Sequence, residues 1–213
     1  MARSRRRGRR ANLRGLLLGV GGLVATLGAR AGSAQISSIA TSAPLLSGVA
    51  AWNVTAMDTS RVGTNWLSII VTTGAVQHLA TLQENKVNAF PSPVSITTQW
   101  SLTSLVSMID VVGYFAAPAA ALVNGTSTIP SSRVEGRMNS GRVPSFTPFT
   151  QQPVFGSGTA GGTLHLVRQA IVLPLNGQSQ RNDQLELRLN LQGAAVLQPG
   201  TYRGTLTLRA VAY

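Results

Sequence analysis

Apolar and polar residues alternate with a period of two along most of the chain after residue 48. The clearest case is segment 184–192, in which leucines occupy every second position and polar residues the others. The terminal segment 202–213 alternates in the same way after the dipeptide Pro199-Gly200. A period of two predicts strands with one buried face. Because a terminal strand needs earlier strands to pair its backbone groups, the pattern predicts an all-β domain.

Further strands follow from the same alternation and from β-branched residues. They are predicted at 49–57, 66–73, 94–102, 105–115 and 163–173. Segment 66–73 is apolar on both faces, as in a strand at the core of a sandwich, and the short link Thr103-Ser104 predicts a hairpin. Segment 116–162 is predicted to be rich in loops, with 116–123 and 129–138 as candidate short strands, and 176–183 is predicted to be a turn region. Segment 76–82 is either a strand or a short helix. Roughly seven to nine strands with such turns indicate an immunoglobulin-like antiparallel β-sandwich.

The first 34 residues have a different pattern from the rest. An Arg-rich segment, 3–14, precedes an apolar stretch, 16–29, and Ala31-Gly-Ser-Ala34 supplies small residues for cleavage. This is the order of a secretory signal peptide, and the apolar stretch is short for a membrane span. We predict cleavage after Ala34, by either Sec or twin-arginine export, with an uncleaved anchor as the alternative. The product is a single domain, 35–213, in the periplasm, at the cell surface or outside the cell.

Charge does not point to a nucleic acid once its positions are considered. The net charge is +12, but eight of the eighteen basic residues precede Gln35, whereas all six acids follow it. The remainder has 10 − 6 = +4, spread singly rather than in a stripe, which is not typical of a nucleic-acid binder. The chain has no cysteine, which excludes disulfides, thiolate metal sites and a cysteine nucleophile.

No motif in the chain predicts catalysis or a cofactor. The string Gly156-x-Gly158-x-x-Gly161 matches a dinucleotide fingerprint, but no apolar strand precedes it and no helical pattern follows. The two histidines, His78 and His165, are not at metal-ligand spacing, and no Gly-x-Ser-x-Gly elbow is present. We therefore expect a non-enzymatic protein without a catalytic residue, cofactor or metal.

Two features leave alternatives open. Asp110 lies inside an apolar run, and a buried carboxylate needs a partner or a raised pKa. It is either a general acid or metal ligand, or a hydrogen-bonded structural residue. Trp52, Trp66, Trp100 and Tyr114 either form a sugar-stacking platform or belong to the core.

The terminal sequence Pro199-Gly-Thr-Tyr-Arg-Gly-Thr-Leu-Thr-Leu208, which continues to Tyr213, resembles the last strand of secreted bacterial pilin-like domains. These include the spore coat protein U type and other chaperone-usher-like subunits. In them a Pro-Gly-x-Tyr turn leads into a Thr-rich strand that closes an immunoglobulin-like sandwich. The resemblance covers about the last fifteen residues. Such subunits often carry a disulfide, which this chain lacks.

The resemblance implies a structural subunit of a cell-surface or fimbria-like assembly. A neighbour's amino-terminal arm would complete an open sandwich by strand addition. Here the arm would be residues 35–48, which either add to a neighbour or fold onto their own domain. Its candidate anchors are Ile36, Ile39, Leu45, Leu46 and Val49. The implied partners are further copies of the chain, related surface subunits and a periplasmic chaperone; no nucleic acid is expected, and a membrane only during export.

Two other functions remain as alternatives. A secreted carbohydrate- or ligand-binding β-sandwich module predicts an exposed aromatic cluster. An eight-stranded outer-membrane barrel would also end in an alternating strand with a terminal aromatic residue, but 5% aromatic residues and several hydroxyl-rich runs do not suit its aromatic girdles.

Overall fold

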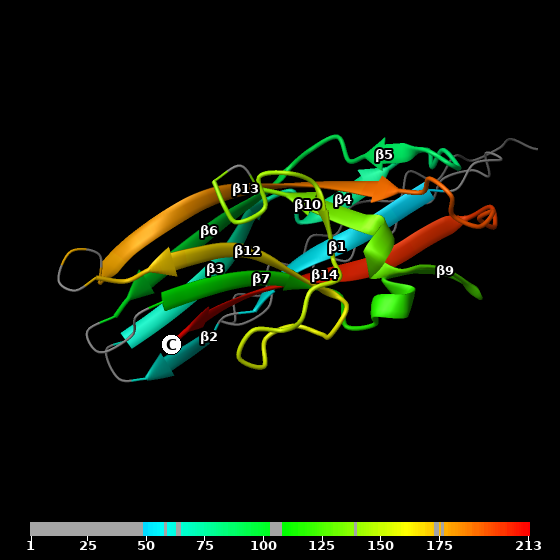
Figure 1. Ribbon diagram of the computed structural model, residues 1–213. Helices are drawn as coiled ribbons and strands as arrows, with labels where there is room; N and C mark the ends of the chain where they lie inside the picture. Colours follow the sequence, from blue (N-terminus) through cyan, green and yellow to red (C-terminus); the bar gives the residue numbers. More distant parts are fainter. Residues whose placement is uncertain are drawn as a thin grey trace, which may run out of the picture.

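The fold consists of two β-sheets packed around one core (Figure 1). The computed structural model describes residues 49–57, 59–62, 65–102, 108–138, 140–172, 175 and 177–213. The predicted signal peptide, 1–34, and the predicted arm, 35–48, therefore lie outside the described residues. The all-β prediction is confirmed, since only two short 3₁₀ helices occur in the described chain, η1 (Pro118–Ala120) and η2 (Ser131–Arg133).

Within the described residues, each sheet has seven strands. The first contains, in spatial order, β12 (Thr163–Ala170), β7 (Met108–Tyr114), β14 (Thr201–Ala212), β1 (Val49–Met57) and β4 (Val76–Leu79), with β8 (Leu122–Asn124) beside β14 and β9 (Ser127–Ile129) beside β8. The second contains β11 (Thr147–Pro148), β10 (Val134–Arg137), β13 (Gln178–Asn190), β6 (Val94–Ser101), β3 (Asn65–Thr73) and β2 (Thr59–Val62), with β5 (Val87–Ala89) beside β13.

The described residues thus form fourteen strands, more than the seven to nine expected from the sequence. Seven of the fourteen have at least seven residues, and the others have two to four. A strand of two to four residues is too short to show a clear alternation, so β4, β8 and β10 were only candidates from the sequence and β2, β5, β9 and β11 were not predicted.

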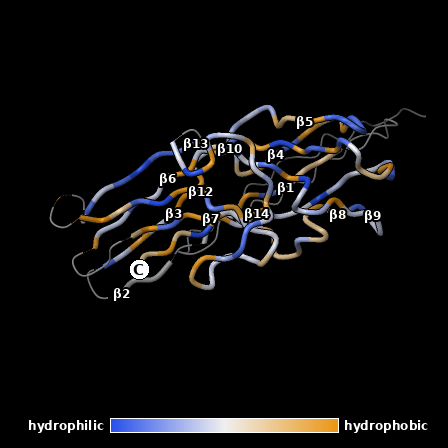
Figure 2. Tube along the Cα trace, viewed as in Figure 1, coloured by the Kyte–Doolittle hydropathy of each residue, from blue (hydrophilic) through white to orange (hydrophobic). Residues whose placement is uncertain are grey.

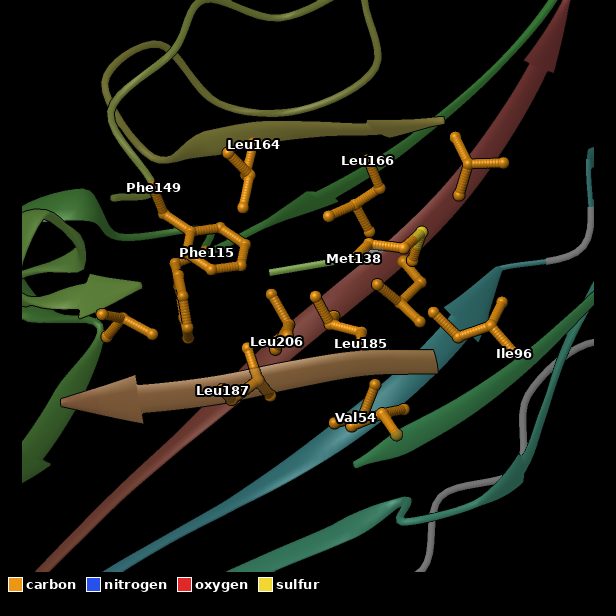
Figure 3. Close-up of a cluster of buried hydrophobic side chains, with 14 of the residues drawn as sticks. Val54, Ile96, Phe115, Met138, Phe149, Leu164, Leu166, Leu185, Leu187 and Leu206 are labelled. Carbon is orange, nitrogen blue, oxygen red and sulfur yellow. The ribbon is translucent and has the colours of Figure 1, made fainter. Parts of the chain in front are cut away.

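The core lies between the sheets and is built from the predicted inward faces. Leu185, Leu187 and Leu189 of β13, and Leu191 directly after it, are all at most 2% exposed. Figure 3 shows Leu185 and Leu187 in one cluster with Leu206 of β14 and Val54 of β1, so the longest strands of both sheets contribute to it. The hydropathy colouring of Figure 2 changes repeatedly along the long strands, as expected when alternate residues face the core and solvent.

β14 lies in the middle of the first sheet. It pairs antiparallel with β7 and parallel with β1, and the β1–β14 ladder is the one parallel pairing among the described strands. The first and last described strands are therefore neighbours throughout, from Val49 aligned with Thr201 to Met57 aligned with Arg209. A parallel pair needs a connection that crosses between its ends. In this chain the connection between β1 and β14 contains all the other described strands, β2 to β13.

Three predictions about elements were wrong. The strands on either side of residues 103–107 form no hairpin, because β6 belongs to the second sheet and β7 to the first. The predicted turn at 176–183 is strand from Gln178 onward, because β13 continues outward alongside β6. Segment 66–73 is buried on one face only: Leu67 and Ile69 face the core, whereas Ile70 is 44% exposed on the outer face.

Candidate functional site

Of the five candidate donor-strand anchors, only Val49 lies within the described residues. Ile36, Ile39, Leu45 and Leu46 lie outside the described residues. Val49 is the first residue of β1, and its backbone is aligned with Thr201 of β14. The chain is thus already part of its own sheet at residue 49. An arm that reaches a neighbour has to consist of the residues before it.

β14 is flanked by strands on both sides. β1 runs beside it from Thr201 to Arg209, while β8 meets it at Arg203 and β7 from Thr207 to Ala212 on the opposite side. Strand addition needs a row of unpaired backbone N–H and C=O groups. Six of the described strands pair with only one neighbour and so leave an edge open: β2, β4, β5, β9, β11 and β12. A donor strand would therefore add at one of these edges and not beside β14.

One of these edges is stepped, because β4 covers only the first half of β1. Residues 50–53 of β1 pair with β4, and the Val54 N–H donates to the Ala75 carbonyl oxygen at 2.7 Å. On that side no described strand pairs with residues 55–57 of β1. We refer to β4 together with residues 55–57 as the stepped edge.

The four aromatic residues considered for a sugar-stacking platform are not gathered on one surface. Trp52 and Trp100 are 1% and 4% exposed. The Trp52 ring packs in the core with its centroid 4.2 Å from that of Phe90. Trp66 on β3 and Tyr114 on β7 are half-buried and belong to different sheets. Trp52 and Trp100 are therefore core residues, as one of the two alternatives predicted.

Asp110 is held in a hydrogen-bonded group that we call the terminal cluster: Asp110, Arg168 and Tyr213. The Arg168 guanidinium donates from Nε to Asp110 Oδ1 and from Nη2 to Oδ2, both at 2.9 Å. The Tyr213 hydroxyl donates to Asp110 Oδ2 at 2.7 Å. Only 1% of the Asp110 side chain is exposed, so these donors replace the water that a carboxylate loses on burial.

The terminal cluster keeps Asp110 ionised. Burial by itself raises the pKa of Asp110, but the hydrogen bonds from Arg168 and Tyr213 and the nearby charges of Arg168 and Arg142 outweigh it and hold the pKa below its usual value. The hydrogen bond to Asp110 is the main reason that the pKa of Tyr213 is raised. A general acid needs a raised pKa, so this geometry agrees with the structural alternative for Asp110.

Backbone hydrogen bonds and a ring contact also hold Tyr213 in place. The Tyr213 N–H donates to the Met108 carbonyl, and the Met108 N–H donates to the Tyr213 carbonyl, each at 3.1 Å. The Tyr213 ring centroid lies 3.9 Å from that of Phe155. The cluster therefore joins β7, β12 and the residue that follows β14.

The two histidines and the glycine-rich string lie in different parts of the described chain. His165 Nε2 lies 2.7 Å from the Gln152 carbonyl oxygen, and His78 is exposed on β4 of the first sheet. The described residues contain no group of three metal-binding side chains. Gly156, Gly158 and Gly161 have positive φ values of 72°, 111° and 71° in a folded loop that leads into β12, so a strand and not a helix follows.

A polar hollow lies over β3, β6 and β13, the middle strands of the second sheet. Its volume is about 410 Å³. The residues that line it are Thr72, Ser95, Ile96, Thr97, Ser140, Asn182, Asp183, Gln184 and Glu186. The strand register explains the grouping, because Ser95 and Thr97 of β6 are aligned with Gln184 and Asn182 of β13.

Both carboxylates of the hollow are paired with arginines. Asp183 accepts from Arg181 Nε at 2.7 Å and from the Ser140 hydroxyl at 2.6 Å. Glu186 accepts from Arg137 Nη2 at 2.5 Å. Because each carboxylate lies against a guanidinium, the electrostatic potential that the two opposite charges produce in the hollow largely cancels. The remaining polar groups of the hollow are neutral hydroxyls and amides.

Pattern analysis did not single out the hollow. The alternation correctly placed Ser95 and Thr97 on the polar face of a predicted strand, but Asn182 was assigned to a turn. Its place opposite Thr97 depends on the pairing of β6 with β13, and no local signal carries that register.

No family model matches the chain, and a search of the curated proteins finds no match. Among the described residues, no helix has the length and hydropathy needed to span a membrane.

Proposed function

We propose that this chain is an exported, non-enzymatic structural subunit of a cell-surface or fimbria-like assembly, with an immunoglobulin-like sandwich as its folded part. The observation that carries the proposal is the pair of contacts made by the Tyr202 hydroxyl at the start of β14, the last strand. The Tyr202 hydroxyl donates to the Gln198 carbonyl oxygen at 3.1 Å and lies 2.6 Å from the Ser127 hydroxyl. Tyr202 is fully buried, so it fastens the Pro199-Gly200 turn to the sheet.

This backward hydrogen bond supports the immunoglobulin-like part of the proposal. The tyrosine corner of immunoglobulin-like sandwiches also joins a tyrosine hydroxyl to the backbone a few residues upstream. Here the acceptor lies four residues before the tyrosine. The resemblance of segment 199–213 to pilin-like closing strands agrees with this geometry, because both assign Tyr202 to anchoring.

Assembly would use the arm at 35–48, which immediately precedes β1. Added strands gain affinity from backbone hydrogen bonds and specificity from alternate side chains that enter pockets. Because β14 is flanked on both sides, the acceptor in this proposal is the stepped edge of another copy. Ile36, Ile39, Leu45 and Leu46 would supply the side-chain anchors. Further copies, related subunits and a periplasmic chaperone are the proposed partners, and the assembly stands at the cell surface.

The proposal is tested by removing the arm. We expect the chain that begins at Gln35 to form polymers, visible by negative-stain microscopy and as large species in sedimentation. We expect the chain that begins at Val49 to remain monomeric with unchanged β-sheet circular dichroism. A matched control keeps the arm length but replaces Ile36, Ile39, Leu45 and Leu46 by serine, and it should also stay monomeric.

The cis alternative predicts a different result. If the arm folds onto its own domain, the chain that begins at Gln35 is monomeric and its deletion lowers the melting temperature. Polymers that persist without the arm would rule out strand addition by this segment.

A further inference from the structure

The polar hollow on the outer face of the second sheet has the chemistry of a binding site. At about 410 Å³ it lies within the range of small-molecule sites, which is roughly 300–1,000 Å³. Unlike most such sites it is lined mainly by hydroxyl, amide and carboxylate groups. A ligand that suits it has to exchange many hydrogen bonds with water and with the protein, and it gains little from apolar contact.

The charges of the hollow are already balanced. Asp183 and Glu186 are bound by Arg181 and Arg137, so the carboxylates do not attract a cation strongly and the guanidinium groups are not free to bind an anion. A charged ligand would have to break an existing ion pair. A neutral ligand does not have to do so.

Two amide side chains keep hydrogen-bonding capacity at the hollow. The Asn182 oxygen accepts from the Thr97 hydroxyl at 2.8 Å, which leaves the amide nitrogen of Asn182 without a partner among the described residues. Gln184 is exposed, and neither end of its amide has a partner in the described chain. A carboxamide presents a donor and an acceptor side by side, and a pair of neighbouring sugar hydroxyls offers the complementary acceptor and donor.

The supporting side chains are fixed by the sheet. Thr97 holds Asn182 across the β6–β13 pair, and the Thr73 hydroxyl donates to the Ser95 hydroxyl at 2.7 Å across the β3–β6 pair. Groups positioned on paired strands lose less conformational entropy on binding than groups on a mobile loop. The hydroxyls of Ser95 and Thr97 and the amide of Asn182 are therefore held in place before a ligand binds, whereas the exposed Gln184 side chain is left to adjust to it.

We propose that the hollow binds a neutral saccharide of one or two rings, with Asn182 and Gln184 as its main hydrogen-bonding residues. This site is separate from the stepped edge and from the arm. It uses planar amides and not the tryptophan platform considered from the sequence. An exported subunit with this site would hold a neutral glycan on the broad outer face of its second sheet.

Saturation-transfer difference NMR on the chain that begins at Gln35 tests the proposal, because the method works for monomers and for large assemblies. The probes are glucose, galactose, N-acetylglucosamine, maltose and cellobiose at millimolar concentration, with a heparin disaccharide as the anionic probe. We expect transfer to at least one neutral sugar. In the double variant Asn182→Ala/Gln184→Ala the affinity for that sugar should fall about tenfold, as expected for the loss of two hydrogen bonds.

The chain offers a matched control on the same face. Gln99 and Gln180 form an amide pair across the same two strands, with Nε2 of Gln99 3.3 Å from Oε1 of Gln180, but they do not line the hollow. The double variant Gln99→Ala/Gln180→Ala should bind the sugar as wild type does. No transfer to any neutral sugar, transfer to the heparin disaccharide alone, or equal losses in both double variants would overturn the proposal. These outcomes are independent of whether the chain polymerises.

Discussion

At the scale of single residues, the terminal cluster shows how one buried carboxylate is accommodated in an all-β core. A buried carboxylate without partners is costly, and the usual response is protonation. Asp110 instead receives two hydrogen bonds from Arg168 and one from Tyr213, the last residue of the chain. The charge that interrupts an apolar strand is therefore used to fix the carboxyl end of β14.

The variant Tyr213→Phe tests this role. It keeps the ring against Phe155 but removes the hydroxyl that donates to Asp110, and we expect a loss of about 1–2 kcal/mol in unfolding free energy. Urea denaturation measures the loss. Thr205→Val, an exposed substitution of similar shape on the same strand, should change stability by less than about 0.5 kcal/mol. Equal stability of Tyr213→Phe and wild type would show that the hydroxyl contributes nothing.

Acid should weaken the fold through the same carboxylate. The folded pKa of Asp110 lies below that of an unfolded aspartate, about 3.9, so between the two values the unfolded chain binds more protons. The contribution of Asp110 is therefore complete above about pH 4 and is lost as the pH falls through the folded value. We expect Asp110→Asn to be less stable at neutral pH and to show a shallower loss of stability in acid, measured by urea midpoints from pH 7 to pH 2. An unchanged acid slope in Asp110→Asn would contradict this assignment.

At the scale of elements, the turn before β14 depends on a glycine. Gly200 has φ +137°, and a Cβ there would lie 2.5 Å from Nδ2 of Asn124, whose amide donates to the Pro199 carbonyl. The turn thus combines a backbone conformation that other residues rarely adopt with a close neighbour. The backbone conformation and the close Asn124 side chain are sufficient to explain why residue 200 is a glycine.

Gly200→Ala should therefore destabilise the domain by more than strain alone. Gly193 is a matched control, since it has φ +64° but nothing within 4 Å of its would-be Cβ. We expect roughly 1–2 kcal/mol of unfolding free energy to be lost in Gly193→Ala from backbone strain, and a larger loss in Gly200→Ala from strain plus the clash. Thermal and urea unfolding of the two variants give the comparison. Equal losses in the two variants would mean that the Asn124 side chain moves away from the new methyl group without a measurable cost in stability.

The elements also show where local pattern fails. Segment 184–192 was read correctly because its leucines alternate over a full strand, but β13 begins six residues earlier, at Gln178. Residues 178–183 include several side chains typical of turns, and their pairing with β6 outweighs that weak local preference. The predicted hairpin failed for a related reason: a short link does not determine whether two strands share a sheet or face each other across the core.

At the scale of the whole molecule, the parallel contact of β1 with β14 defines the topology. Asn53 and Thr205 are aligned in this ladder. Neighbouring strands are about 4.8 Å apart, which lies within the Cα–Cα range that a disulfide spans. Because the chain has no native cysteine, a pair introduced here is free of competing thiols.

The double variant Asn53→Cys/Thr205→Cys should oxidise within one chain, seen as faster migration in non-reducing electrophoresis. The pair Asn53→Cys/Thr207→Cys, shifted by two residues, should oxidise much more slowly. The oxidised first pair also bears on assembly, because it locks β1 against β14. We expect it to polymerise as wild type does, since the proposed acceptor is the stepped edge. Loss of polymers only after oxidation would place the acceptor between these two strands instead.

The sequence by itself determined the all-β fold class, the polar and apolar faces of segments 94–102 and 184–192, and the anchoring residues Pro199, Gly200 and Tyr202. These properties are local, since side chains alternate along any strand and turns need particular backbone conformations. Tertiary structure alone decided that β1 lies beside β14, that Asp110 meets Arg168 and Tyr213, and that Thr97 faces Asn182 across the polar hollow. Those contacts join residues 58 to 152 positions apart along the chain, and a period of two does not specify which strand pairs with which.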